Sequence, residues 1–187
     1  MTENFNDTIK VYGLFKIESF KQGELIDTIE QKNLIMDLAR NQFAKFCGGI
    51  VTDPINKLVL GTQGHVGSDT DTPKTSTEGF ISSRTNLFSE VSGTNHVNFE
   101  NFSFTPNGIS GSTVTCTDGV STANISSLNN IATFIVDIPE NVGNGTGSIT
   151  FTEAALYTGT NIFSMRTFKG RLKDNSIALR ITWKIIF

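Results

Sequence analysis

The chain has 187 residues, of which 37% are hydrophobic and 18% are charged, and its net charge is −3. This length suits one domain with a hydrophobic core of its own, and the charged share lies below the usual ~25%. Because Lys and Arg form no cluster, the composition argues against a protein that binds the phosphate backbone of nucleic acid.

The start of the chain and its cysteines bear on the cell compartment. The polar stretch from Met1 to Asp7 lacks the basic-then-apolar build of a signal peptide, and no apolar run approaches the ~18 residues of a membrane span. Cys47 and Cys116 are too few for a disulfide framework or a zinc site, so we expect two ordinary thiols. We therefore expect a protein that is made in a cytoplasm, stays soluble and has no membrane partner.

The first predicted elements are two strands. Thr8 to Ser19 reads as a strand with apolar alternation, and Gln22-Gly23 predicts a hairpin turn into Leu25 and Ile26. We treat residues 1–27 as an N-terminal arm with one or more strands that contacts neighbouring molecules.

The hydrophobic period then changes to that of a helix. Thr28 and Gln31 have capping-box spacing, and Gly48-Gly49 supplies a C-terminal stop. The apolar residues between them recur at helical spacing: Leu34, Ile35, Leu38, Ala39, Phe43 and Phe46. The pattern predicts one amphipathic helix over residues 29–47.

Many short strands separated by Gly, Asn and Ser turns follow the helix. Ile55 to Leu60 is a strand that ends at Gly61, and a polar loop occupies residues 61–79. Further strands are predicted at 80–91, 97–105, 112–117, 131–138, 148–157, 162–168 and 177–187, with turns at Asn107-Gly108 and Gly143–Gly147. This pattern indicates a mainly β chain, an antiparallel β-sandwich of jelly-roll type, with residues 28–187 forming a single domain that includes the helix.

The last predicted strand has the clearest pattern in the chain. Apolar residues occupy every second position from Ile177 to Phe187, so one face of the strand is buried and the other is wet. Trp183 belongs to the apolar face. The aromatics Phe99, Phe102 and Phe104 do not keep one parity, which indicates a bulge or a change of face. Core packing is the favoured interpretation, and an exposed ring that stacks on a sugar or inserts into a neighbour stays open.

His65, Asp69 and Asp71 are the first candidates for chemistry. They lie close together in the 61–79 loop and could hold a cation or form an acid–base pair. The spacing matches no known ligand set, however, and a solvated turn is the favoured interpretation. The sequence Gly61-Thr62-Gln63-Gly64 follows a strand as phosphate loops do, but it lacks the Lys-Ser/Thr ending and a following helix.

Glu153 is the second candidate. It stands in a strand between small and apolar residues, where it could be catalytic, but pairing with a basic neighbour is favoured. Arg166, Arg180 and Lys184 on later strands are the expected partners. We predict no catalytic residue, no cofactor and no metal ligand.

Several segments in a fixed order resemble one protein family. They are Leu58–Thr62, Asp69–Pro73, Arg84, Glu153–Tyr157, Phe163–Arg166 and Ile181–Ile185. Their order, an apolar strand ending Gly-Thr, an Asp/Thr loop, an Arg-containing strand, a Glu-Ala segment and a closing Thr/Trp strand, resembles bacteriophage virion proteins of tails, baseplates, fibre attachments and collars. It covers most of residues 30–187, but Ala155 replaces the family's usual Gly, and the 61–79 loop is longer.

The resemblance implies a non-enzymatic structural protein of the phage particle, localised in the virion and assembled as a homo-oligomer. Its partners would be copies of itself and other virion proteins, with the N-terminal segment and the 61–79 loop as contact elements. Three alternatives stay open: a head decoration or head-fibre base protein, a carbohydrate-binding module that recognises a host-surface glycan, and a small hydrolase using Glu153 and His65.

Overall fold

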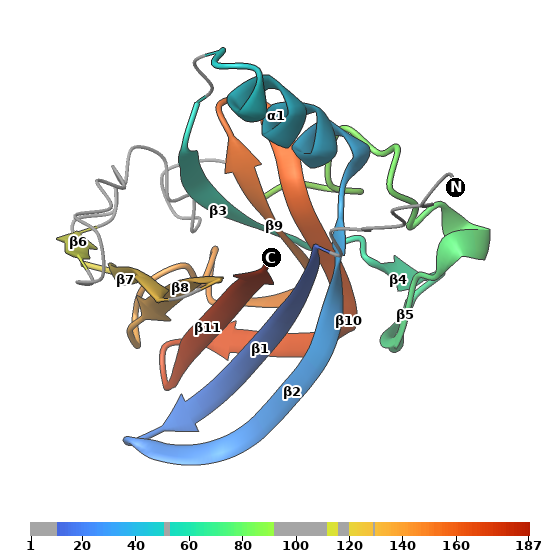
Figure 1. Cartoon of the computed structure of the whole chain (residues 1–187). Helices are drawn as coiled ribbons and strands as arrows, with labels where there is room; N and C mark the ends of the chain where they lie inside the picture. The colour runs from blue at the N-terminus through green and yellow to red at the C-terminus, as the bar shows by residue number, and fades with distance from the viewer. Residues whose placement is uncertain (1–10, 51–52, 92–111, 116–119, 129) are drawn as a thin grey trace, which may run out of the picture.

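The computed structural model describes residues 11–50, 53–91, 112–115, 120–128 and 130–187, which are mainly β with one α-helix (Figure 1). Nine strands pair antiparallel in one sheet of order β3-β9-β10-β2-β1-β11-β8-β7-β6, and β4 and β5 form a separate hairpin. The sheet strands are β1 (Tyr12–Lys21), β2 (Glu24–Ile35), β3 (Ile55–Gly61), β6 (Ser112–Thr115), β7 (Thr122–Leu128), β8 (Ile131–Ile138), β9 (Ser148–Thr158), β10 (Asn161–Asp174) and β11 (Ile177–Ile186). The remaining elements are α1 (Asp37–Cys47), β4 (His65–Val66), β5 (Asp69–Pro73) and the 3₁₀ turn η1 (Ser76–Glu78).

The sheet curls because β2 belongs to both of its halves. Most of β2 pairs with β1, and only Leu34 and Ile35 at its end pair with β10. The two halves therefore face each other across a core, where the ring of Phe15 on β1 stacks on Phe168 of β10, with centroids 5.1 Å apart. Trp183 of β11 meets the same Phe15 ring edge-on at 5.0 Å. Burial of these aromatic rings joins one half of the sheet to the other.

The expectation of a mainly β chain is confirmed, whereas the jelly-roll sandwich is not. Hydrogen-bonded pairing runs without a break from β3 to β6, so the structure has one curled sheet where two separate sheets were expected. No helix of the described residues is long and apolar enough to cross a membrane.

The predicted helix over residues 29–47 is wrong in its first third. Ile29 to Ile35 lie in β2, and α1 begins only at Asp37. The apolar positions in this stretch fit either period, and pairing with β1 decides, because Ile29 lies opposite Ile17 in the antiparallel register. The helix itself packs through Phe43, whose ring meets that of Phe163 edge-on at 5.5 Å.

The division into an arm over 1–27 and a domain over 28–187 also needs correction. β1 lies between β2 and β11, and its residues Phe15 and Ile17 are completely buried in the core. A boundary after Asp27 would cut β2 in two. Residues 12–27 are therefore part of the sheet, and residues 1–10 lie outside the described residues.

The strands expected at 55–60, 131–138, 148–157 and 177–187 are confirmed. The strand expected at 162–168 continues to Asp174, β7 was not predicted, and the 61–79 loop contains the β4-β5 hairpin. The segment 80–91 is no strand, apart from an isolated bridge between Gly61 and Glu90. The elements expected at 97–105 and at Asn107-Gly108 lie outside the described residues.

Candidate functional site

The Glu153 carboxylate is the most densely bonded buried charge in the described part of the chain. It has no exposed surface. Oε1 accepts N–H bonds from Ser89 at 2.7 Å and Gln63 at 3.3 Å, and Oε2 accepts one from Phe88 at 2.8 Å. The side chain therefore holds two separate loops against β9, and these three hydrogen bonds all come from main-chain groups.

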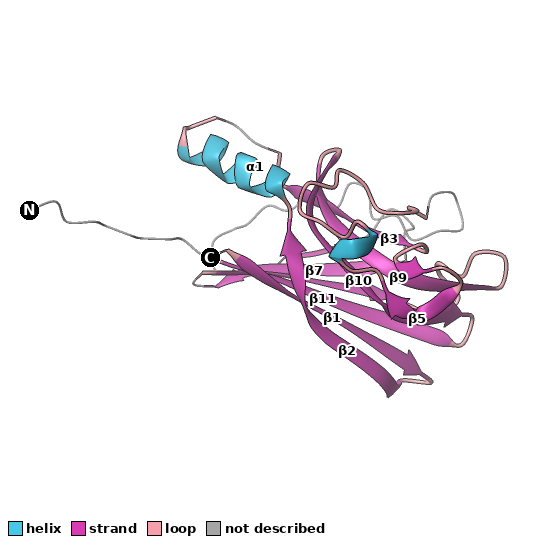
Figure 2. Cartoon of the chain, turned by 90° about the vertical axis from the view of Figure 1, so that its right-hand side faces the viewer, coloured by secondary structure: helices cyan, strands magenta, loops and turns pink. Residues whose placement is uncertain are grey.

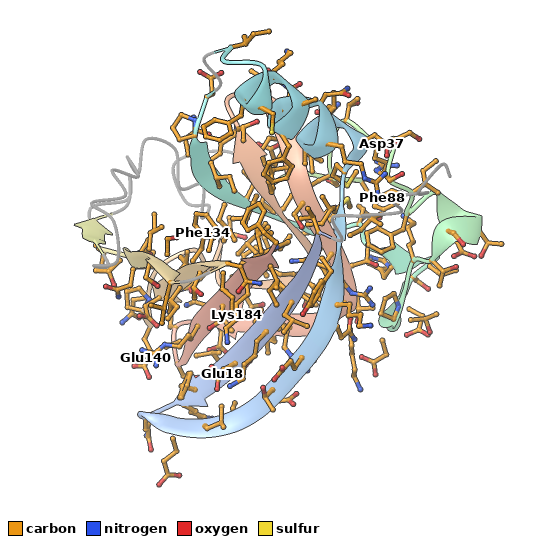
Figure 3. The ribbon with its side chains drawn as sticks, in the orientation of Figure 1. Glu18, Asp37, Phe88, Phe134, Glu140 and Lys184 are labelled. Carbon is orange, nitrogen blue, oxygen red and sulfur yellow. The ribbon has the colours of Figure 1, made fainter. Side chains whose placement is uncertain are left out.

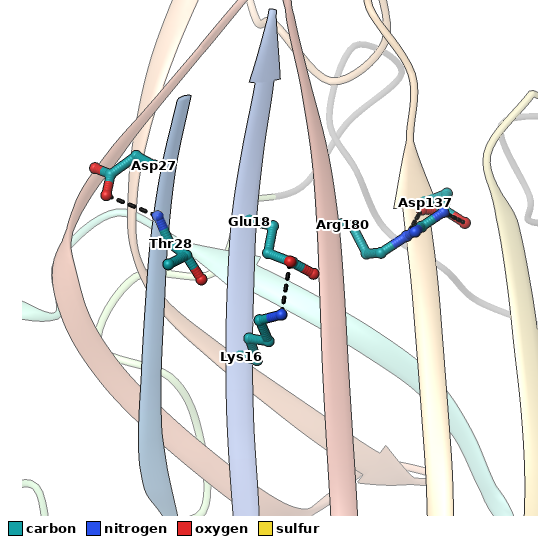
Figure 4. A network of polar contacts seen from close by, with 6 residues as sticks. All are labelled: Lys16, Glu18, Asp27, Thr28, Asp137 and Arg180. Carbon is teal, nitrogen blue, oxygen red and sulfur yellow. Dashed lines mark hydrogen bonds and ion pairs between the residues drawn. The ribbon is translucent and has the colours of Figure 1, made fainter. Parts of the chain in front are cut away.

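The expected basic partner of Glu153 is wrong. The guanidinium of Arg166 instead donates to Gln31 Oε1 at 2.6 Å and to the Lys32 carbonyl at 3.2 Å. Arg180 pairs with Asp137 across β11 and β8 at 2.6 Å (Figure 4). Lys184 lies on β11, well away from Phe88 (Figure 3). Backbone N–H groups therefore satisfy the Glu153 carboxylate, where a basic side chain was expected to pair with it.

Burial raises the pKa of the Glu153 carboxyl above its ordinary value, against the opposing effect of the N–H groups of Phe88, Ser89 and Gln63 and, last, the nearby Arg84 guanidinium. A carboxyl whose pKa is raised in the folded state binds its proton more tightly there than in the unfolded chain. Its contribution to stability is therefore complete below the ordinary pKa and is lost as the pH rises through the raised pKa.

We therefore expect the stability of the natural chain, relative to a Glu153→Gln variant, to decrease as the pH is raised from ~4 to ~7. The glutamine side chain cannot ionise, so the comparison isolates this one carboxyl. Urea unfolding of both proteins across this pH range measures the difference. A difference in unfolding free energy that is constant, or that grows with pH, would contradict the assignment.

The glycines of the Gly61-Thr62-Gln63-Gly64 sequence allow this loop to approach Glu153. A Cβ atom on Gly61 would lie 2.5 Å from Glu153 Oε1, and one on Gly64 would lie 2.4 Å from the Thr152 carbonyl oxygen. The Gly64 N–H also donates to Thr152 Oγ1 at 2.9 Å. The loop that looked superficially like a phosphate loop thus wraps a carboxylate of its own chain.

Residues 80–91, which we call the strap, cover the outer face of β3, β9 and β10. Leu87 of the strap is buried in a second apolar cluster with Val59, Ala155, Tyr157 and Met165. The Arg84 guanidinium lies 3.7 Å from the centroid of the Phe88 ring and donates to the carbonyls of Asn86 and Leu87. Gly61, Arg84 and Glu153, which come from three separate segments of the chain, therefore lie near one another.

The loop carboxylates near His65 have partners within the β4-β5 hairpin and on β10. Asp69 accepts bonds from the Thr72 hydroxyl and the Asp71 N–H, which lower the pKa of its carboxyl. Asp71 forms an ion pair with Lys169 on β10 at 3.2 Å. Among the residues that the structure describes, no three His, Cys, Asp or Glu side chains gather as a metal site would require.

The helix α1 lies across one end of the curled sheet (Figure 2). Residues of α1 and of the sheet line an apolar cleft there. Its volume is about 760 Å³, and its lining residues are Val11, Arg40, Gln42, Phe43, Phe46, Cys47, Asp53, Pro54, Ile55, Ala132, Phe134, Thr158, Phe163 and Phe187. Two of its aromatics face solvent, Phe46 with 71% and Phe187 with 44% of its surface exposed. Cys47 is a free, exposed thiol on the same cleft.

The sequence signalled this cleft only in part. Phe43 and Phe46 were both assigned to the buried face of a helix, but α1 has 11 residues and buries only Ala39 completely. Phe46 stands in the last turn of α1 and is exposed. The neighbouring Gly48-Gly49 was the available sign in the sequence that the helix ends there.

The fold and these two features define a mainly β protein with a carboxylate-anchored strap and an open apolar cleft. Comparison of the chain with family models, with curated proteins and with solved structures gave no match.

Proposed function

We propose that the chain is a non-enzymatic structural component of a bacteriophage particle, in the tail, baseplate or fibre-attachment apparatus. It acts by assembly, with symmetry-related copies burying surfaces against each other and against neighbouring virion proteins. In this proposal the two facing halves of the curled sheet serve as a rigid, sandwich-like scaffold for these contacts.

The observation that carries the proposal is the apolar cleft with its exposed rim. Phe46 and Phe187 are both exposed and both line this apolar cleft, and contiguous exposed apolar surface commonly marks an interaction site. The strap supports a structural role for Glu153, because its carboxylate accepts hydrogen bonds from the strap and so holds two parts of the chain together. The resemblance to virion proteins is the reason for proposing a phage particle, and the cleft is the proposed contact surface.

The test compares the solution mass of the natural chain with that of two serine variants. We expect the natural chain to form a defined oligomer and Phe46→Ser to shift it toward the monomer, because the variant removes an exposed ring from the proposed contact. Leu25→Ser is the matched control, since Leu25 is 52% exposed at the β1-β2 hairpin, away from the cleft, and should leave the mass unchanged. Light scattering after size-exclusion chromatography measures all three.

Two outcomes would contradict the proposal. One is a monomer at every concentration tested, and the other is an oligomer that both substitutions leave intact.

A further inference from the structure

We propose that the cleft under α1 binds residues 1–10 of a second copy of this chain. This inference rests on the proposed function, since it names the segment by which one copy would contact the next. Its structural basis is the cleft, the place where the segment leaves the described fold, and the sequence of the segment.

The segment starts at the cleft. Val11, the residue that follows it, lines the cleft and directly precedes β1. Along β1 the odd-numbered residues Phe15 and Ile17 face the core. In the sequence, Phe5 and Ile9 have the same odd parity, so the apolar pattern of β1 extends into residues 1–10.

The reach of the segment favours a second copy over its own cleft. Residues 1–10 contain no Gly or Pro, the strongest signals for reversing the chain direction. In extended conformation a residue advances about 3.3 Å, so Phe5 would lie about 20 Å beyond Val11. An extended segment of this length would be long enough to reach the cleft of a second copy.

The chemistry of the cleft fits this segment. The rings of Phe43 and Phe163 meet edge-on inside the cleft, and a further Phe or Ile side chain would be removed from water there. At the lip, Arg40 is exposed and pairs with Asp37 at 2.8 Å, and Gln42 and the acidic Asp53 also line the cleft. The segment carries Glu3 and Asp7, acidic partners for Arg40.

The native thiol of Cys47 allows a direct test by cross-linking. In a Cys116→Ser background, Phe5→Cys places a second thiol in the segment, and Cys47 lies exposed on the cleft. After mild oxidation we expect disulfide-linked dimers and higher species on a non-reducing gel, with mass spectrometry identifying the peptide that joins position 5 to Cys47. Two controls are the background alone, which reports pairing between two Cys47 thiols, and Leu25→Cys in the same background, whose thiol lies away from the cleft. Both should cross-link several-fold less.

Each other outcome overturns the inference. A disulfide between position 5 and Cys47 within one copy would assign the cleft to the chain's own segment, and cross-linking no greater than in the controls would remove the segment from the cleft. The solution mass of the same samples separates this inference from the proposed function. An oligomer without the disulfide overturns the inference alone, whereas a monomer without it overturns both.

Discussion

Replacing Glu153 with Ala is expected to destabilise the fold by about 3–5 kcal/mol. The variant would leave the partly buried N–H groups of Phe88, Ser89 and Gln63 without their acceptor, and an unsatisfied buried N–H group costs about 1–3 kcal/mol. A neutral cavity also replaces a fully buried side chain. Urea unfolding measures the total, and amide hydrogen exchange in the strap locates it.

Glu153→Gln is the matched control, because it keeps the shape and one acceptor oxygen while removing the charge. We expect a much smaller loss of stability than for Ala, and exchange in the strap that is slower than in the Ala variant. If the Ala and Gln variants lost equal stability, neither the shape of the Glu153 side chain nor its acceptor oxygen would be holding the strap. An Ala variant as stable as the natural chain would contradict the account of the anchor.

Replacing Trp183 with Ala is expected to cost about 3–5 kcal/mol, the range for removing a large buried aromatic. Trp183 has no exposed surface and joins the two halves of the sheet. Its ring meets Phe15 on β1, and its indole N–H donates to Ser164 Oγ on β10 at 3.2 Å. Urea unfolding followed by circular dichroism measures the loss.

The control for this prediction is Trp183→Phe, which keeps an aromatic ring but loses the bond to Ser164. We expect it to lose clearly less stability than the Ala variant does, and to stay folded if Ala does not. Leu172→Ala, at an exposed position of β10, should change the stability little. A loss for Trp183→Ala as small as that for Leu172→Ala would show that the two halves are not joined there.

The strands with strict alternation were predictable because their pattern and their pairing obey the same period. β11 alternates between buried and wet positions along its whole length, and it pairs with β1 on one side and β8 on the other. The hairpin turn was predictable for a similar local reason. Gln22 and Gly23 both have positive φ, 54° and 81°, as a two-residue hairpin turn requires.

The start of α1 was not predictable from local pattern. Leu34 and Ile35 fit the apolar stripe of a helix. In the structure they pair with Met165 and Ser164 of β10, and this short pairing connects the two halves of the sheet. The choice between strand and helix therefore depended on a partner 130 residues away along the chain, Ser164, whose hydroxyl donates to the Leu34 carbonyl. A capping-box pattern at Thr28 carries no information about that contact.

The partner of Glu153 was hidden for another reason. Main-chain N–H groups occur at nearly every position, so no residue type marks the ones that a buried carboxylate will bind. The glycines at 61 and 64 were the nearest sign, because they permit a close approach to β9. The cleft was equally hidden, since the exposure of Phe46 depends on where α1 crosses the sheet.

The most direct measurement of the central claim is immunogold electron microscopy of purified particles from the source, with an antibody against this chain. The account predicts label on the tail, baseplate or fibre-attachment region. Label over the head would favour the head decoration or head-fibre base alternative. A chain that is present in the lysate but absent from intact particles would contradict the assignment to the virion.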